Sequence, residues 1–148
     1  MRMRHFRGHG VHSPYVYALV REVFMTRRNA TACDPAFEAA LVEAGLSLRA
    51  ARELQQISRR CGCKTWGVDR EGDGMTCLTC AADGELCRRV LSQARTAGYT
   101  VVIVRPYADR ERVRFCDAVI AAHTSTSVDR GSYILLFNNH LPKQHFVL

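Results

Sequence analysis

The stretch "YTVVIVRPYADRERVRFCDAVIAA", residues 99–122, decides the fold class. Its first six residues are mostly β-branched, which is typical of a strand covered on both faces in a parallel sheet. Asp109 then predicts a helix start, because an aspartate accepts hydrogen bonds from the free amides of a first helical turn. The apolar positions of this helix recur at helical spacing, at Val113, Cys116, Val119 and Ile120. A buried strand followed by an amphipathic helix indicates an α/β protein.

Elements of the same two kinds flank this stretch on both sides. Before it, the sequence predicts a helix over about residues 85–97, closed by Gly98. Further upstream, "CKTWGVDREGDGMTCLTCAADG" at residues 63–84 holds two short candidate strands around an acidic, glycine-bearing turn. After it, "GSYILLF" at 131–137 and "KQHFVL" at 143–148 predict two adjacent strands joined by a short loop.

The alternation of strands and helices predicts one sheet with helices on both faces. We expect residues 64–74 and 99–104 to lie side by side as parallel inner strands. We expect the last two strands of the chain to form an antiparallel pair. A cleft at the carboxyl ends of the parallel strands is the usual ligand site of such a sheet.

Residues 1–62 predict a helical extension in front of this sheet, which occupies residues 63–148. Three helix starts are marked by side chains that can cap free amides, at Ser13, Asp34 and Ser47. With 148 residues and 47% hydrophobic composition, the chain can build one ordinary core. We therefore expect the two parts to form one compact unit.

Composition and charge bear on partners and compartment. The net charge is +7, but acidic residues accompany most of the arginine clusters, which indicates solvated helix faces and disfavours a nucleic-acid interface. No stretch approaches the ~20 apolar residues that span a bilayer or forms the apolar core of a secretory signal. Seven cysteines, an odd number, favour reduced thiols. These features predict a cytoplasmic protein without a membrane partner.

Three segments resemble a bacterial group of class I S-adenosylmethionine-dependent methyltransferase-like proteins. They are "HGVHSPYVYALV" at 9–20, the helix and first strand at 49–76, and the last third of the chain at 101–148. Their most specific parts are the His-Ser-Pro entry and the closing Leu-Pro-Lys-Gln-His-Phe. The resemblance implies a Rossmann-like sheet that binds S-adenosylmethionine. Members of this group carry further strand-helix units after the first glycine loop, so this sheet is a reduced one.

The resemblance also implies where the cofactor lies. In the group, the first strand ends in a motif similar to Glu-Leu-Gly-Thr-x-x-Gly, and an acid after the next strand binds the ribose hydroxyl groups. The matching stretch here is residues 68–74, followed by one acidic candidate further along. The implied cofactor-binding residues are Asp69, Gly72, Gly74 and Asp83.

Several positions depart from this pattern. Val68 stands where the group has the acid, and Arg70 stands where it has the first glycine, which adds bulk where backbone must approach the ligand. Arg105 and Pro106 replace two carboxylates of the group. We therefore expect a methyltransferase-like protein of weak or lost activity, an enzyme by resemblance only. The alternative is a non-catalytic binding or assembly module, including a homo-oligomer formed through uncovered sheet edges.

The cysteines support an alternative of another class. Four thiolates at Cys61, Cys63, Cys77 and Cys80 could hold a structural zinc in an anion-binding domain. If residues 75–80 form a strand, however, Cys77 and Cys80 project from opposite faces. A redox dithiol is a further alternative, and buried small apolar residues are the default interpretation of these cysteines.

Three histidines complete the candidate residues, because each titrates near neutral pH. They are His123, His140 and His145. Single histidines at a helix end, a turn and a terminal strand are more often structural or surface groups. The sequence thus names no catalytic base, and the substrate stays unassigned.

Overall fold

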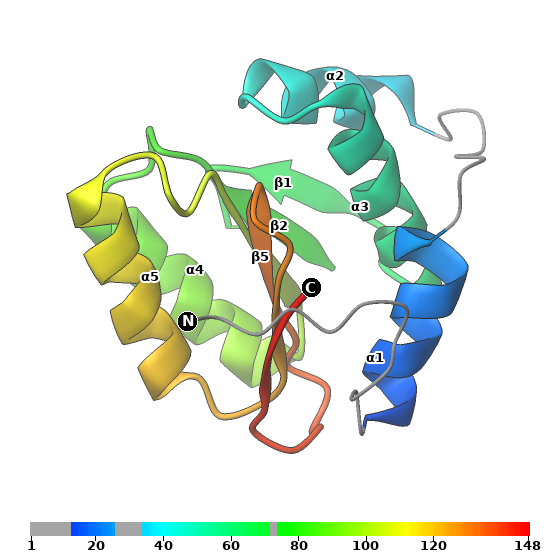
Figure 1. Ribbon diagram of the computed structural model, residues 1–148. Coiled ribbons are helices and arrows are strands. Elements are labelled where there is room, and N and C mark those ends of the chain that lie inside the picture. Colours follow the sequence, from blue (N-terminus) through cyan, green and yellow to red (C-terminus); the bar gives the residue numbers. More distant parts are fainter. Residues whose placement is uncertain (1–12, 26–33, 72–73) are drawn as a thin grey trace.

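A mixed sheet forms the centre of the molecule, with helices on both of its faces (Figure 1). The computed structural model describes residues 13–25, 34–71 and 74–148. Its elements are α1 (Pro14–Leu19), the π-helical turn η2 (Val20–Phe24), α2 (Pro35–Glu43), α3 (Leu48–Arg60), β1 (Trp66–Val68), β2 (Met75–Leu78), α4 (Gly84–Ala97), β3 (Thr100–Val104), α5 (Arg110–Ala122), β4 (Ser127–Asp129), β5 (Tyr133–Leu136) and β6 (His145–Val147). The prediction of an α/β fold is confirmed.

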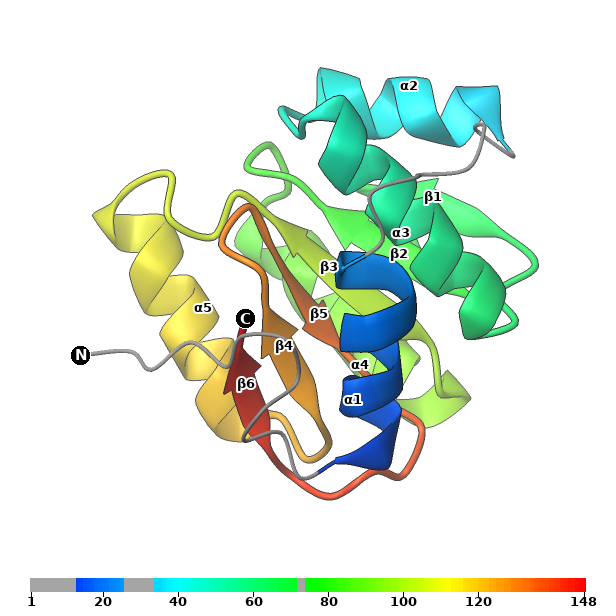
Figure 2. The same ribbon diagram turned by 45° about the vertical axis from the view of Figure 1, so that its right-hand side comes forward.

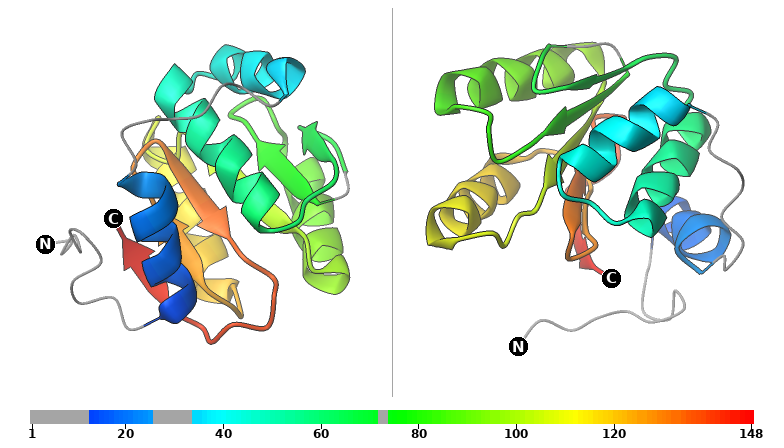
Figure 3. Two further views of the ribbon diagram at one scale, coloured as in Figure 1. Left: turned by 90° about the vertical axis from the view of Figure 1, so that its right-hand side faces the viewer. Right: turned by 90° about the horizontal axis from the view of Figure 1, so that it is seen from above.

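The two faces of the sheet carry different helices. α1 and α3 cover one face, with α2 beside them, and α4 and α5 cover the other (Figures 2 and 3). β3 shows how both layers are held: Val102 and Val104 join the core under α1–α3, whereas Val101 and Ile103 join the core under α4 and α5. Every residue of β3 is buried, so this strand is covered on both faces as predicted.

The strand order is β1-β2-β3-β5-β4-β6. β1, β2 and β3 are parallel neighbours. β5 runs antiparallel to both β3 and β4, and β6 runs parallel to β4. The strand direction therefore reverses between β3 and β5, because β3 has a parallel neighbour on one side and an antiparallel one on the other.

Two predictions about strand neighbours are wrong. β1 and β3, the strands within residues 64–74 and 99–104, are not adjacent, because β2 lies between them and pairs with both. The segments 131–137 and 143–148 are not paired either, since β4 lies between them. β4 escaped prediction because it has only three residues, two of them polar. The antiparallel pair is β4 with β5, joined by a tight turn in which Arg130 N–H donates to the Tyr133 carbonyl at 2.9 Å.

The helix starts follow the predicted capping residues. Ser13, Asp34, Ser47 and Asp109 accept hydrogen bonds from amides of their first helical turns. α4 begins at Gly84, one residue before the predicted start, and ends where Gly98 adopts a left-handed conformation. These local signals are correct because each depends on residues only a few positions apart.

Trp66 connects β1 to α2. Its ring stacks on Phe37 with centroids 4.7 Å apart, and its Nε1 donates to Asp34 Oδ2 at 2.7 Å. The same Asp34 carboxylate accepts from the Phe37 amide, and these two hydrogen bonds lower its pKa. One aspartate thus starts α2 and holds that helix at the edge of the sheet.

Among the helices of the described residues, none combines the length and the apolar character that crossing a bilayer requires.

Substitution of Gly74 tests how closely the start of β2 approaches Thr65. It has a φ of +82°, and a Cβ added there would lie 2.8 Å from the Thr65 carbonyl oxygen. We expect Gly74→Ala to lower the free energy of unfolding by about 2–3 kcal/mol, because a clash adds to the cost of a left-handed alanine. Urea unfolding measures this loss.

Gly62→Ala is the matched control. Gly62 has a φ of +69°, but an added Cβ would meet no atom within 4 Å. Only the conformational cost of about 1–2 kcal/mol then applies. Equal losses in the two variants would contradict the close approach of Gly74 to Thr65.

Candidate functional site

The carboxyl ends of β1, β2 and β3 meet at one edge of the sheet, where a ligand of this fold class is expected. Asp69 follows β1 there, with a φ of +52°. Its carboxylate accepts a hydrogen bond of 2.8 Å from the Thr79 amide and a second, very short one from the Thr79 hydroxyl group. Thr79 follows β2 directly. Asp69 therefore ties the ends of β1 and β2 together and has its oxygens engaged inside the protein.

Arg70 lies beside the same edge and folds back onto β1. Its guanidinium group donates to the Trp66 carbonyl at 3.1 Å and lies 5.7 Å from the centroid of the Trp66 ring. Its side chain also packs over Gly67, where Arg70 Cγ would come within 3.0 Å of an added Cβ. Arg70, which stands where the resembled group has its first glycine, thus covers the backbone of β1.

The implied cofactor-binding residues do not converge. Gly72 lies outside the described residues. Gly74 precedes β2 and therefore lies at the opposite, amino-terminal edge, against Thr65. Asp83 is exposed and caps α4 by accepting from the Leu86 amide at 2.8 Å. Of the described positions, only Asp69 lies at the carboxyl edge beside β1.

The four cysteines of the zinc alternative are also dispersed. Cys61 and Cys63 follow α3, and Cys77 lies within β2 in the core under α1–α3. Cys80 lies past the other end of β2, in a hollow beside α4 and α5. β2 ends at Leu78, so residues 75–80 do not form one strand, but Cys77 and Cys80 lie on different sides of the sheet. Within residues 13–25, 34–71 and 74–148, no three Cys, His, Asp or Glu side chains are grouped to hold a metal.

The buried cysteines behave as small apolar side chains. Burial raises the pKa of Cys77 to about 12 and that of Cys116 to about 11. Cys87 is also buried, and its pKa is raised for the same reason. Of the four cysteines that were interpreted as buried apolar residues by default, only Cys77 is buried; Cys61 and Cys63 are half-buried and Cys80 is exposed.

A buried polar cluster that the sequence did not reveal joins α3 to the sheet. Glu53 on α3 is only 3% exposed, and it accepts hydrogen bonds of 2.9 Å from Arg130 and from the Tyr133 hydroxyl group. Arg130 also lies 4.3 Å from the centroid of the Phe24 ring. Burial and the nearby Glu53 charge raise the pKa of Tyr133 well above its usual range. The sequence signal that could have revealed this cluster was Glu53 itself, an acidic residue on the inner face of the amphipathic helix α3.

Arg112 holds the ends of two strands at the same edge. It is 8% exposed and donates to the carbonyls of Leu78 and Val104, both at 2.9 Å. These carbonyls end β2 and β3. Tyr107 donates nearby to the carboxylate of Asp129, the last residue of β4. The polar side chains of the carboxyl edge thus bind mainly to the protein itself.

The histidines lie apart and have separate partners. His123 is buried, with Nε2 2.8 Å from the Phe137 carbonyl oxygen, and burial lowers its pKa. His145 Nδ1 lies 2.7 Å from the Ser127 hydroxyl group, between β6 and β4. His140 is exposed in the loop before β6. The prediction that they are structural or surface groups agrees with these positions.

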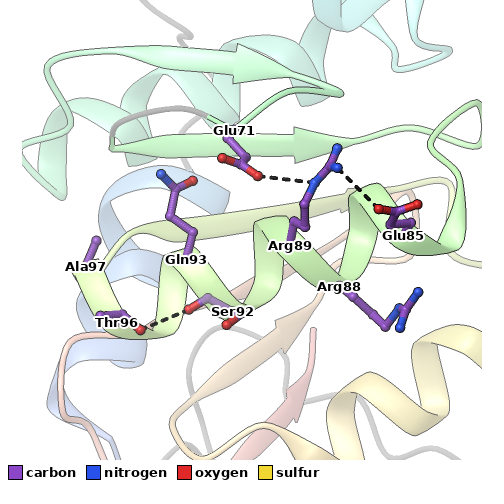
Figure 4. Close-up of a pocket in the computed structure, with 8 residues that line it drawn as sticks. All are labelled: Glu71, Glu85, Arg88, Arg89, Ser92, Gln93, Thr96 and Ala97. Carbon is purple, nitrogen blue, oxygen red and sulfur yellow. Dashed lines mark hydrogen bonds and ion pairs between the residues drawn. The ribbon is translucent and has the colours of Figure 1, made fainter.

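An open groove of about 690 Å³ runs along α4. Figure 4 shows Arg89 in it, between Glu71 at 3.3 Å and Glu85 at 3.5 Å. All three side chains are about half exposed or more, so these ion pairs contribute little to stability. A second hollow, of about 450 Å³, lies at the amino-terminal edge of the sheet beside Cys61 and Cys63.

Comparisons of the chain with protein-family models, with curated proteins and with solved structures find no match.

Removing the Glu53 carboxylate tests the buried cluster. Glu53→Ala leaves the Arg130 charge and the Tyr133 hydroxyl group without this acceptor. We expect a loss of about 3–5 kcal/mol in the free energy of unfolding, because an uncompensated buried charge is costly. Tyr133→Phe, which removes one neutral donor, is expected to cost about 1 kcal/mol. Denaturant unfolding of the two variants tests this order, and a smaller loss for Glu53→Ala would contradict it.

His123 predicts a pH dependence of stability. Its pKa in the fold lies below the usual value of 6.5, so between these two values the unfolded chain binds a proton that the fold excludes. The free energy of unfolding should fall as the pH decreases from about 6.5 through the lowered pKa. Thermal unfolding from pH 7 to pH 5 measures it. His123→Gln should flatten this slope and His140→Gln should not; an unchanged slope in His123→Gln would rule the explanation out.

Proposed function

We propose that this chain is a methyltransferase-like protein that works as a non-catalytic binding or assembly module, with a reduced S-adenosylmethionine cleft. The proposal starts from the resemblance at both ends of the chain and from the α/β sheet with helices on both faces. We propose both descent from a methyltransferase and loss of activity, because the α/β sheet and the altered cleft residues occur in the same molecule.

The observation that carries the proposal is the connection between β1 and β2. These strands are parallel neighbours, yet only residues 69–74 join them. Parallel neighbours are ordinarily joined by a crossover of roughly a dozen residues or more, usually with a helix. This is the place where the resembled group carries its further strand-helix units, and six residues are too few to hold such a unit, which supports the proposal of a reduced cofactor cleft.

The direction of the connections supports the same proposal. Ligands of open α/β sheets bind where the strand order reverses, since adjacent connections there leave a crevice. The described chain steps from β1 to β2 to β3 and on toward β4 in one direction along the sheet. α4 and α5, the helices of the last two steps, accordingly share one face (Figure 1).

The side chains at the end of β1 support it as well. Asp69 is engaged by Thr79, and Arg70 covers β1 by bonding to the Trp66 carbonyl. A bound nucleoside would have to displace both contacts. Assembly of two copies through the outer strands β1 and β6 stays a prediction, based on the tendency of sheet edges to pair.

A ligand titration tests the proposal. We expect S-adenosylmethionine and S-adenosylhomocysteine at millimolar concentration to leave the Tm unchanged. An intact site with ligand at about 100 times its Kd would add about 2.7 kcal/mol, a Tm increase of several degrees in a chain of this size. A mixture of adenosine and methionine is the control for weak nonspecific effects. A saturable Tm increase with the cofactor alone, lost in Asp69→Asn, would overturn the proposal.

A further inference from the structure

The amino-terminal edge of the sheet carries a pair of thiols on a rigid turn. Cys61, Gly62 and Cys63 end α3, and their amides donate to the carbonyls of Ile57, Arg59 and Ser58 at 2.9, 3.0 and 2.9 Å. This is a Schellman-type helix end, for which the φ of +69° at Gly62 is suited. The backbone thus holds both cysteines in a defined geometry.

Both thiols line the hollow of about 450 Å³. Each cysteine is half-buried, so it is accessible to a small molecule without being freely solvated. The Tyr15 hydroxyl group comes from α1 to within 3.1 Å of Cys61 Sγ. Arg60 and Lys64 also line the hollow, which gives its rim a positive character, although Arg60 is paired with Glu22 of η2.

The contacts of the two sulfurs make them unequal. The Cys63 thiol donates to Cys61 Sγ, and this hydrogen bond, with those of Tyr15 and Thr100 and the Arg60 charge, lowers the pKa of Cys61 to about 6. Burial of Cys61 and its place at the carboxyl end of α3 both disfavour a negative charge, so these contacts lower the pKa of Cys61 in spite of both effects. The pKa of Cys63 is raised by the hydrogen bond that it donates and by burial. These contacts favour a thiolate at Cys61 over one at Cys63.

We propose that Cys61 and Cys63 form a redox dithiol that exchanges with small anionic disulfides, with Cys61 as the nucleophile and Cys63 as the resolving thiol. Lys64 on the rim suits an anionic disulfide such as oxidised glutathione, whereas the charge of Arg60 is already paired with Glu22. The site lies at the edge opposite the reduced cofactor cleft, so it goes beyond the proposed function and does not depend on it.

The exchange balances as two displacements. The Cys61 thiolate attacks one sulfur of the disulfide and forms a mixed disulfide with it, while the original sulfur-sulfur bond breaks and the first thiolate leaves and takes a proton from solvent. The Cys63 thiol then loses its proton to solvent and attacks Cys61 Sγ, which releases the second thiolate. The protein dithiol is oxidised to the Cys61–Cys63 disulfide, and the small disulfide is reduced to two thiols.

Alkylation at pH 6 tests the nucleophile. With a pKa of about 6, half of Cys61 is thiolate at that pH, against well under a hundredth for a cysteine of ordinary pKa. The lower intrinsic nucleophilicity of such a thiolate offsets part of this gain, which leaves about a tenfold faster reaction in the folded than in the urea-unfolded chain. Iodoacetamide labelling followed by peptide mapping measures both rates. Equal rates in the two states would overturn the proposal.

Oxidation of the full chain with oxidised glutathione tests the pair. We expect intact-mass spectrometry to show loss of two hydrogens, mapped to the peptide with Cys61 and Cys63. Cys63→Ser should instead retain one glutathione on Cys61, because the resolving thiol is gone, and Cys61→Ser should retain none at Cys63. A glutathione adduct at Cys80 alone, which is exposed but lies away from this hollow, would overturn the proposal.

Tyr15 and Tyr17, both on α1, provide a second pair of variants, in which both cysteines stay unchanged. Tyr15→Phe removes the hydroxyl group beside Cys61 and should slow alkylation at pH 6 several-fold. Tyr17→Phe changes an exposed ring on the same helix and should leave the rate unchanged. Equal effects of both changes would contradict the role of Tyr15. Neither outcome bears on cofactor binding, so failure here and failure of the proposed function are distinguishable.

Discussion

The structure depends on one constraint: β3 must be buried on both faces and paired on both sides. Its residues Val101 to Val104 alternate between the core under α4 and α5 and the core under α1–α3. It pairs in parallel with β2 and antiparallel with β5. Because apolar burial is the main source of stability and an unpaired buried amide is costly, this strand fixes the place of both helical layers.

The two ends of the parallel strands have different characters as a result. At the carboxyl edge, Asp69 and Arg112 bond to the ends of neighbouring strands, and Arg70 folds back onto the Trp66 carbonyl of β1. Polar groups there stabilise the sheet because they replace water as partners of backbone carbonyls and amides. At the amino-terminal edge, the end of α3 leaves a hollow that contains Cys61 and Cys63. The carboxyl edge, where a ligand is expected, is thus more completely filled by side chains than the amino-terminal edge.

The short link between β1 and β2 and the filling of the carboxyl edge are physically connected. With only residues 69–74 between β1 and β2, the end of β1 lies directly beside the end of β2. Asp69 can then accept from Thr79, a contact that an intervening strand-helix unit would leave little room for. The buried Glu53, Arg130 and Tyr133 cluster stabilises the opposite layer by tying α3 to the β4–β5 turn.

The sequence by itself determined the fold class, the helix starts and the double burial of β3. Capping at Ser13, Asp34, Ser47 and Asp109 and apolar periodicity act over a few residues, so they can be recognised without knowing the neighbours. Only the tertiary structure decided that β2 separates β1 from β3, that β4 exists, that Glu53 is buried and that Tyr15 meets Cys61. These features depend on contacts between residues far apart in the chain, and no local pattern specifies which distant partner a strand or side chain meets.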